Sequence, residues 1–157
     1  MPIENFLKDL AENSLADFVQ AAKFANCDLS NNSIDFQILP APHRPPSLPL
    51  GKIAVYSFFF GETCLKVGKV GPNSGPRYLS QHYIPSSSGS NLARSLAGSL
   101  TWSEKHGFSG ENVGSWIKEN TARINFTMPE VIGLDVLALL EAFLHCRWKP
   151  QFEGKIT

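Results

Sequence analysis

The stretch that decides the fold is residues 53–67, which read IAVYSFFF, then GET, then CLKV. The first eight residues are rich in β-branched and aromatic side chains, and the last four form a second short apolar run, so each run predicts a β-strand. Residues 61–63 between them include a glycine, which is typical of a β-hairpin turn. In this hairpin we expect Tyr56 and Lys66 to lie opposite each other, or within one residue of that register, and to share a face of the sheet. A register slip of one residue would place them on opposite faces.

The rest of the chain predicts further helices and one more strand. Apolar spacing over residues 3–26 indicates two short helices interrupted at Asn13 and Ser14. Residues 31–49 are rich in proline and lack periodicity, which favours an extended connector. The later segments are predicted as helices over 76–83, 92–100, 115–120 and 134–148, and as a strand over 122–128, in which Ile124 and Phe126 alternate with Arg123 and Asn125.

Length and charge limit the possibilities. A chain of 157 residues with 43% hydrophobic content suffices for one compact domain. The 14 basic side chains balance 14 acidic ones, so the overall charge does not indicate a polyanionic partner. Residues 51–105 carry six basic and two acidic groups, a local excess that fits either an anionic partner or an ordinary solvated face.

The cysteine content and the hydropathy indicate a compartment. Cys27, Cys64 and Cys146 form no CxxC pair and leave an odd thiol, which suits a reducing environment. Neither a signal peptide nor a run of 18 apolar residues occurs in the sequence. We therefore expect a cytoplasmic protein with no membrane association.

Two charged residues stand in unusual positions. Arg77 lies in the first turn of its predicted helix, where the helix dipole disfavours a cation, so it suggests an anionic partner. Glu141 lies in a helix that is apolar all round and therefore largely buried. A buried carboxylate needs a cation, a metal or several donors. The alternatives are an exposed glutamate or a salt bridge, for example to Arg147.

Taken together, these residues carry a resemblance to a known family. Their order resembles the signature of the GIY-YIG nuclease superfamily over residues 51–153. The matching positions are Ala54-Val55-Tyr56, Lys66-Val67-Gly68, Arg77, His82 and Glu141.

The resemblance implies a fold and a chemistry. The implied fold is a mixed α/β fold of the α+β class, with a small three-stranded antiparallel sheet flanked by helices; the predicted strands at 53–60, 63–67 and 122–128 match that number. Tyr56 would be the general base or would relay the proton, with Lys66 keeping its pKa low; Arg77 would clamp the scissile phosphate, and His82 would orient the nucleophile or accept from it. Glu141 would hold one Mg²⁺ or Mn²⁺, and the products would carry 5′-phosphate and 3′-hydroxyl ends.

Three positions depart from the family pattern. Ala54 replaces the first signature glycine, and Lys66 replaces the second signature tyrosine, as it does in phage and restriction-enzyme branches of the superfamily. Glu153 stands where many members place an asparagine. Both of the first two changes look compatible with activity.

The predicted partner is DNA. The resemblance implies that residues 1–50, with the N-terminal helices and the proline-rich connector, are an extension to a nuclease domain over 51–157, and that 84–120 is an elaboration of its core. Within that elaboration Trp102 and Trp116 either stack on unpaired bases or pack a satellite core. Compact relatives suggest a single-stranded substrate, although the residues themselves do not decide between strand states. The predicted phosphate contacts are Lys52, Lys69, Arg94, Lys105, Lys118 and Arg123.

Two other functions fit the same residues. One is a non-catalytic nucleic-acid-binding module on the same fold, and the other is a binder of small phosphate ligands.

Overall fold

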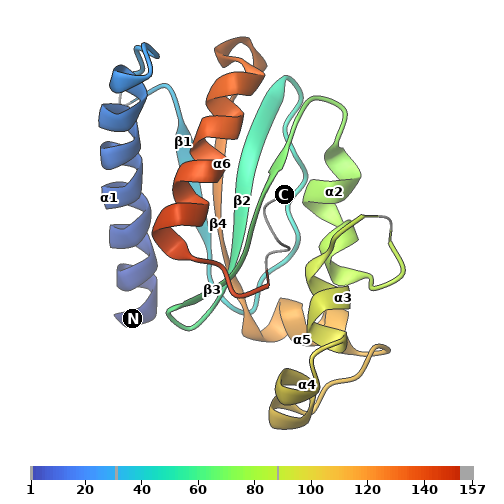
Figure 1. Ribbon diagram of the computed structural model, residues 1–157. Coiled ribbons are helices and arrows are strands. Elements are labelled where there is room, and N and C mark those ends of the chain that lie inside the picture. Colours follow the sequence, from blue (N-terminus) through green and yellow to red (C-terminus); the bar gives the residue numbers. More distant parts are fainter. Residues whose placement is uncertain (1, 31, 88, 153–157) are drawn as a thin grey trace.

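The computed structural model describes residues 2–30, 32–87 and 89–152, and it shows an α+β fold (Figure 1). Four antiparallel strands form one sheet in the order β1-β4-β2-β3. The strands are β1 (Asp35–Leu39), β2 (Lys52–Phe60), β3 (Thr63–Val70) and β4 (Ala122–Pro129). Glu153, which the sequence places at a family position, lies outside the described residues.

The predicted hairpin forms, with a register two residues from the expected one. Gly61 has a positive φ of 57° in the turn between β2 and β3. Tyr56 pairs with Gly68, and Lys66 pairs with Phe58, so Tyr56 and Lys66 are not directly opposite. Side chains on a strand repeat every two residues, so the two residues still share a face of the sheet.

The strand β1 corrects two predictions, because the sheet has four strands rather than three and the connector is partly regular. Phe36 and Ile38 pair with Phe126 and Ile124 of β4, and all four belong to or pack against the same apolar core. A five-residue strand inside a proline-rich segment gives little periodic signal. It forms because the exposed edge of β4 offers it hydrogen bonds and an apolar face.

The N-terminal segment is one long helix, α1 (Pro2–Phe24), so the predicted break at Asn13 and Ser14 is wrong. Ser14 is fully buried, and its Oγ accepts a hydrogen bond of 3.1 Å from the indole Nε1 of Trp148. Trp148 of the last helix thus satisfies the hydroxyl of Ser14, the residue that was expected to end the first helix.

Helices cover both faces of the sheet (Figure 1). The helices α1 and α6 (Leu134–Trp148) pack on one face. The opposite face is covered by α2 (Gly75–Leu79), the short 3₁₀ helix η1 (Gln81–Tyr83), α3 (Leu92–Ala97) and α5 (Val113–Asn120). We call these the α6 face and the α2 face. Every residue of β2 from Ile53 to Phe59 is consequently buried.

Two predicted helices are divided in the structure. The segment 76–83 becomes α2 followed by η1, and the segment 92–100 ends at Ala97. A separate helix, α4 (Leu100–His106), follows and lies away from the sheet (Figure 1). A further 3₁₀ turn, η2 (Glu130–Ile132), precedes α6. Among the described residues, no helix is both long enough and apolar enough to cross a bilayer.

Candidate active site

The centre of the candidate site is Tyr56, which is fully buried on the α2 face of β2. Its ring lies against Gly68, its partner on β3. A Cβ atom at Gly68 would stand 2.3 Å from the Tyr56 hydroxyl oxygen and 2.5 Å from its Cζ, closer than real Cβ contacts. The glycine of the second signature triplet is therefore required here to make room for the tyrosine of the first.

His82 holds the hydroxyl group of Tyr56. Its Nδ1 accepts a hydrogen bond of 3.1 Å from the backbone N–H of Leu92. In the neutral ring the proton must then be on Nε2, which contacts the Tyr56 oxygen and donates to it. The tyrosine proton is accordingly directed to an acceptor other than His82.

The imidazole of His82 is neutral at physiological pH. Burial lowers its pKa from 6.5 to about 2, and the positive charges of Arg77, Lys66 and Arg123 contribute in the same direction. His82 is therefore a fixed hydrogen-bond donor that does not exchange a proton during a reaction near pH 7.

Two cations lie beside this pair. Lys66 is almost completely buried, and its Nζ donates to Ser90 Oγ at 3.4 Å. The half-buried Arg77 donates from Nη2 to the backbone carbonyl of Ser90 at 2.9 Å. One loop residue thus contacts both cations, and both are near enough to depress the pKa of His82. The structure brings Tyr56, Lys66, Arg77 and His82 together as the sequence predicted.

Arg123 has a different position from the predicted one. It is completely buried, so its predicted contact with a nucleic-acid backbone is wrong. It lies on the α2 face of β4, which α2 and η1 cover, and its Nη1 donates to the Tyr78 carbonyl at 3.0 Å and to the Tyr83 hydroxyl at 3.1 Å. Its Nε donates to Asn125 Oδ1 at 3.2 Å.

This buried cation lies close to the catalytic tyrosine candidate. The guanidinium carbon of Arg123 is 5.7 Å from the ring centroid of Tyr56. Within the described residues, Arg123 Nη2 and Asn125 Nδ2 are buried and have no hydrogen-bond partner. Asn125 pairs with Tyr56 across the β2–β4 ladder. The charge of Arg123 and two donors without hydrogen-bond partners therefore lie near the Tyr56 ring.

Glu141 lies on the other side of the sheet. Its Oε1 forms an ion pair of 2.9 Å with Lys69 Nζ, and 22% of its side chain is exposed. Lys69 pairs with Val55, whose side chain belongs to the α6 core, whereas Tyr56 belongs to the α2 core. Glu141 has therefore found a cation, as one alternative predicted, and the cation is Lys69.

The proposed salt bridge to Arg147 does not form. Arg147 pairs with Asp17 of α1 at 2.6 Å.

Glu141 offers a metal ion a single carboxylate ligand. Among the described residues, no group of three or more His, Cys, Asp and Glu side chains could hold an ion. Mg²⁺ is often held by one or two carboxylates, with water and substrate phosphates as its other ligands. The partly exposed Glu141 meets that minimum once Lys69 releases it.

The remaining predicted phosphate contacts differ in their exposure and in the contacts that the structure shows for them. Arg94 is occupied, because its guanidinium donates to the carbonyls of Pro85, Ser87 and Gly89 and so shapes the loop that carries Ser90. Lys52 is partly exposed, and Lys105 and Lys118 are exposed.

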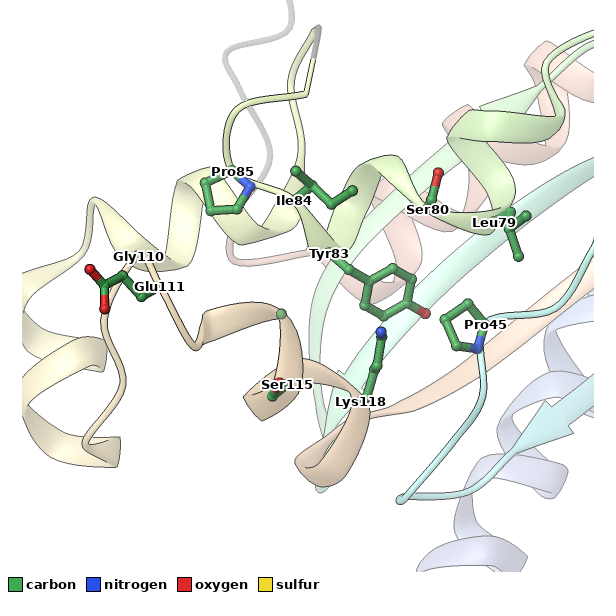
Figure 2. Close-up of a pocket in the computed structure, with 11 residues that line it drawn as sticks. Pro45, Leu79, Ser80, Tyr83, Ile84, Pro85, Gly110, Glu111, Ser115 and Lys118 are labelled. Atoms are coloured by element: carbon green, nitrogen blue, oxygen red, sulfur yellow. The ribbon is translucent and has the colours of Figure 1, made fainter.

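Lys118 borders a cavity of about 530 Å³ between η1 and α5 (Figure 2). Its Nζ lies 5.5 Å from the centroid of the Tyr83 ring, which also lines the cavity. A Cβ on Gly114 would meet the Tyr83 carbonyl at 2.3 Å, so α5 approaches η1 closely here. Tyr83 connects the cavity to the interior through its bond with Arg123.

Sequence reasoning missed His43 and Ser90. His43 Nδ1 donates to the Thr121 carbonyl at 2.6 Å, and its Nε2 accepts from the Tyr83 hydroxyl at 2.7 Å. Burial is the main cause that lowers the pKa of His43. His43 lies in the aperiodic connector and Ser90 in a serine-rich loop, so no pattern distinguished either residue.

Comparisons of the chain with protein-family models, with curated proteins and with solved structures give no match.

Proposed function

We propose that this chain is a metal-dependent DNA endonuclease of the GIY-YIG type, which hydrolyses phosphodiester bonds to 5′-phosphate and 3′-hydroxyl ends. The observation that carries the proposal is that the Tyr56 ring packs directly on Gly68 and that its hydroxyl is hydrogen-bonded to a neutral His82. Core packing alone does not require a phenol that is oriented by a buried imidazole and flanked by Lys66 and Arg77.

In the proposed reaction Tyr56 accepts a proton from the attacking water. It does so as the phenolate, whose negative charge the Nε2–H of His82 stabilises through the existing hydrogen bond before the transfer, and it becomes a neutral phenol as the water oxygen attacks the phosphorus. The buried guanidinium of Arg123 acts in the same direction at 5.7 Å from the ring. Neither group has to move or exchange a proton during this step.

Arg77 would bind the scissile phosphate, and the almost completely buried Lys66 would stabilise the Tyr56 phenolate from within the site. Arg77 already presents its guanidinium beside Ser90, and its planar donors suit two phosphoryl oxygens. Glu141 would hold one Mg²⁺ or Mn²⁺, which would neutralise charge on the phosphoryl and leaving oxygens when bound.

One observation favours the second candidate, a non-catalytic nucleic-acid-binding module on the same fold. Glu141 is paired with Lys69 on the α6 face, whereas Tyr56 faces α2. If this ion pair persists when nucleic acid binds, the cations of the α2 face would bind a phosphate without hydrolysing it.

A cleavage panel separates the two functions. Supercoiled, linear and single-stranded DNA are incubated with Mg²⁺, Mn²⁺ or EDTA, with randomised sequence so that any motif preference appears. We expect metal-dependent nicks in at least one substrate, and loss of cleavage with retained DNA binding in Tyr56→Phe and Glu141→Gln. Glu12→Gln, which changes an exposed carboxylate on α1, is the matched control. Inert, well-folded protein across the whole panel would reject the enzyme and favour the binding module.

A further inference from the structure

A second cavity lies at the turn end of the β2–β3 hairpin, where α4 approaches it. Its volume is about 360 Å³. Three aromatic side chains line it, and hydroxyl, amide and ammonium groups complete the lining. The residues are Phe60, Trp102 and His106, with Thr63, Thr101, Lys105 and Gln151.

The aromatic side chains form a connected cluster. The Phe60 ring centroid lies 4.9 Å from that of His106 and 5.6 Å from that of Trp102. Trp102 and His106 are 4.9 Å apart with planes inclined by 33°. All three residues are only partly buried. The cluster is therefore a satellite core, as one alternative predicted, but part of its aromatic surface remains open to the cavity.

The helix α4 is not explained by burial in the main core. None of its seven residues is fully buried, and Leu100 is 73% exposed. The helix is nevertheless well formed, with Ser99 Oγ accepting from Trp102 N–H at its start and Gly107 in the left-handed conformation at its end. What the helix contributes is the placement of Trp102, Lys105 and His106 around the cavity.

We propose that this cavity binds an unpaired nucleobase of a DNA single strand whose backbone runs to the Tyr56 site. The inference rests on the proposed function and specifies its substrate. Base stacking on an aromatic side chain suits any base, and the ammonium of Lys105 suits the adjoining phosphate. The volume is near the lower limit of small-ligand pockets, which fits one base better than a larger ligand.

The position of the cavity matches the path of such a strand. Tyr56, Phe58 and Phe60 alternate along β2 and pack on the same core, so Phe60 is on the face that carries the candidate site. Four residues of extended strand place it about 13 Å from Tyr56. Helices cover the residues of β2 between Tyr56 and Phe60, so the strand would pass over the outside of these helices rather than along the sheet. A single strand can turn one base into the cavity on that route, whereas a base in a duplex is held inside its stack.

The test measures binding, which is independent of cleavage. Fluorescence anisotropy with a labelled single-stranded oligonucleotide and with its duplex is recorded in EDTA, in a Tyr56→Phe background. Trp102→Leu should weaken single-strand binding about tenfold, which is the loss of one base stack, and should leave duplex binding unchanged. Lys105→Ala, an exposed change that leaves the aromatic cluster intact, should lower the salt slope by about one.

Matched controls are available on α1, which packs on the opposite face of the sheet. Phe24→Leu removes an aromatic side chain that is 91% exposed, and Lys8→Ala removes an exposed lysine. Both should bind single strands as the parent does. Equal losses for single strand and duplex, or full affinity in Trp102→Leu and Lys105→Ala, would overturn the proposal. A nucleoside monophosphate that competes as well as the strand would also overturn it.

The outcomes for the cavity and for the enzyme are separable. If the cavity variants lose single-strand affinity while the wild-type protein cleaves nothing, the proposal that the cavity binds a base is supported and the proposed endonuclease activity is rejected. If cleavage depends on Tyr56 while Trp102→Leu binds normally, the endonuclease stands and the cavity fails. Absence of any single-strand binding by the parent rejects the cavity.

Discussion

The replacement Gly68→Ala tests whether a residue without a Cβ is needed at position 68 to make room for the Tyr56 ring. Ordinary van der Waals contact with a Cβ begins at 3.4 Å, so the phenol oxygen, at 2.3 Å, would have to move by about 1.1 Å. The contact at Cζ, 2.5 Å, means that the whole ring must shift. Overpacking of this kind costs about 1–3 kcal/mol in the free energy of unfolding. Displacement of a catalytic group by about 1 Å lowers the rate on the order of 100-fold.

Two measurements with one control decide this prediction. Urea denaturation gives the free energy of unfolding, and DNA cleavage gives the rate if the proposed function holds. Gly75→Ala is the matched control, since nothing lies within 4 Å of a Cβ there. We expect it to leave stability within about 0.5 kcal/mol of the parent. If Gly68→Ala is as stable as Gly75→Ala, the tyrosine does not need the glycine and the reasoning about the site is refuted.

Three further predictions concern charged groups. The pKa of His82 falls from 6.5 to about 2 on folding, so below pH 6.5 the unfolded chain binds a proton that the folded chain does not. As the pH is lowered from 6.5, the free energy of unfolding should therefore decrease by up to about 1.4 kcal/mol per pH unit. His82→Asn should make this decrease smaller in urea titrations between pH 7 and 5, and an unchanged slope would contradict the assignment. Lys69→Met should change stability by less than about 1 kcal/mol, because the pair is partly exposed, but it should raise Mn²⁺ affinity at Glu141 in an EPR titration; equal affinity would argue against Glu141 as the ligand. Arg123→Met should destabilise the fold by about 3 kcal/mol or more in urea denaturation, because it removes three hydrogen bonds to buried acceptors, of which the Tyr83 hydroxyl keeps its bond to His43. A loss of less than about 0.5 kcal/mol, as for an exposed side chain, would contradict the burial of this cation.

Local patterns predicted the parts of the fold that local chemistry controls. The hairpin followed from two apolar runs and a glycine turn, and the helix α6 was predicted with the bounds 134–148 that the structure shows. The grouping of Tyr56, Lys66, Arg77 and His82 followed from the family resemblance, whose signature residues lie on one hairpin and the helical segment after it. Each of these depends on residues fewer than thirty positions apart.

Two of the errors came from contacts between distant segments. Ser14 does not end its helix because Trp148, on the last helix, supplies a hydrogen bond. Arg123 is not a surface cation because the segment from α2 to η1 covers its face of the sheet, and Tyr78 and Tyr83 accept its hydrogen bonds. Alternation along β4 predicted correctly that Arg123 and Ile124 face opposite ways, but not that both faces are buried.

The sequence by itself determined the hairpin and the helix α6, because strand alternation, turn chemistry and helix periodicity act over a few residues. Its resemblance to a known family supplied the set of residues that handle a phosphate in the proposal. Only the tertiary structure decided which ring nitrogen of His82 carries the proton, that Gly68 makes room for Tyr56, and that Glu141 pairs with Lys69 on the other face. The reason is physical: burial, hydrogen-bond partners and the sharing of a face are properties of segments that meet only when the chain is folded.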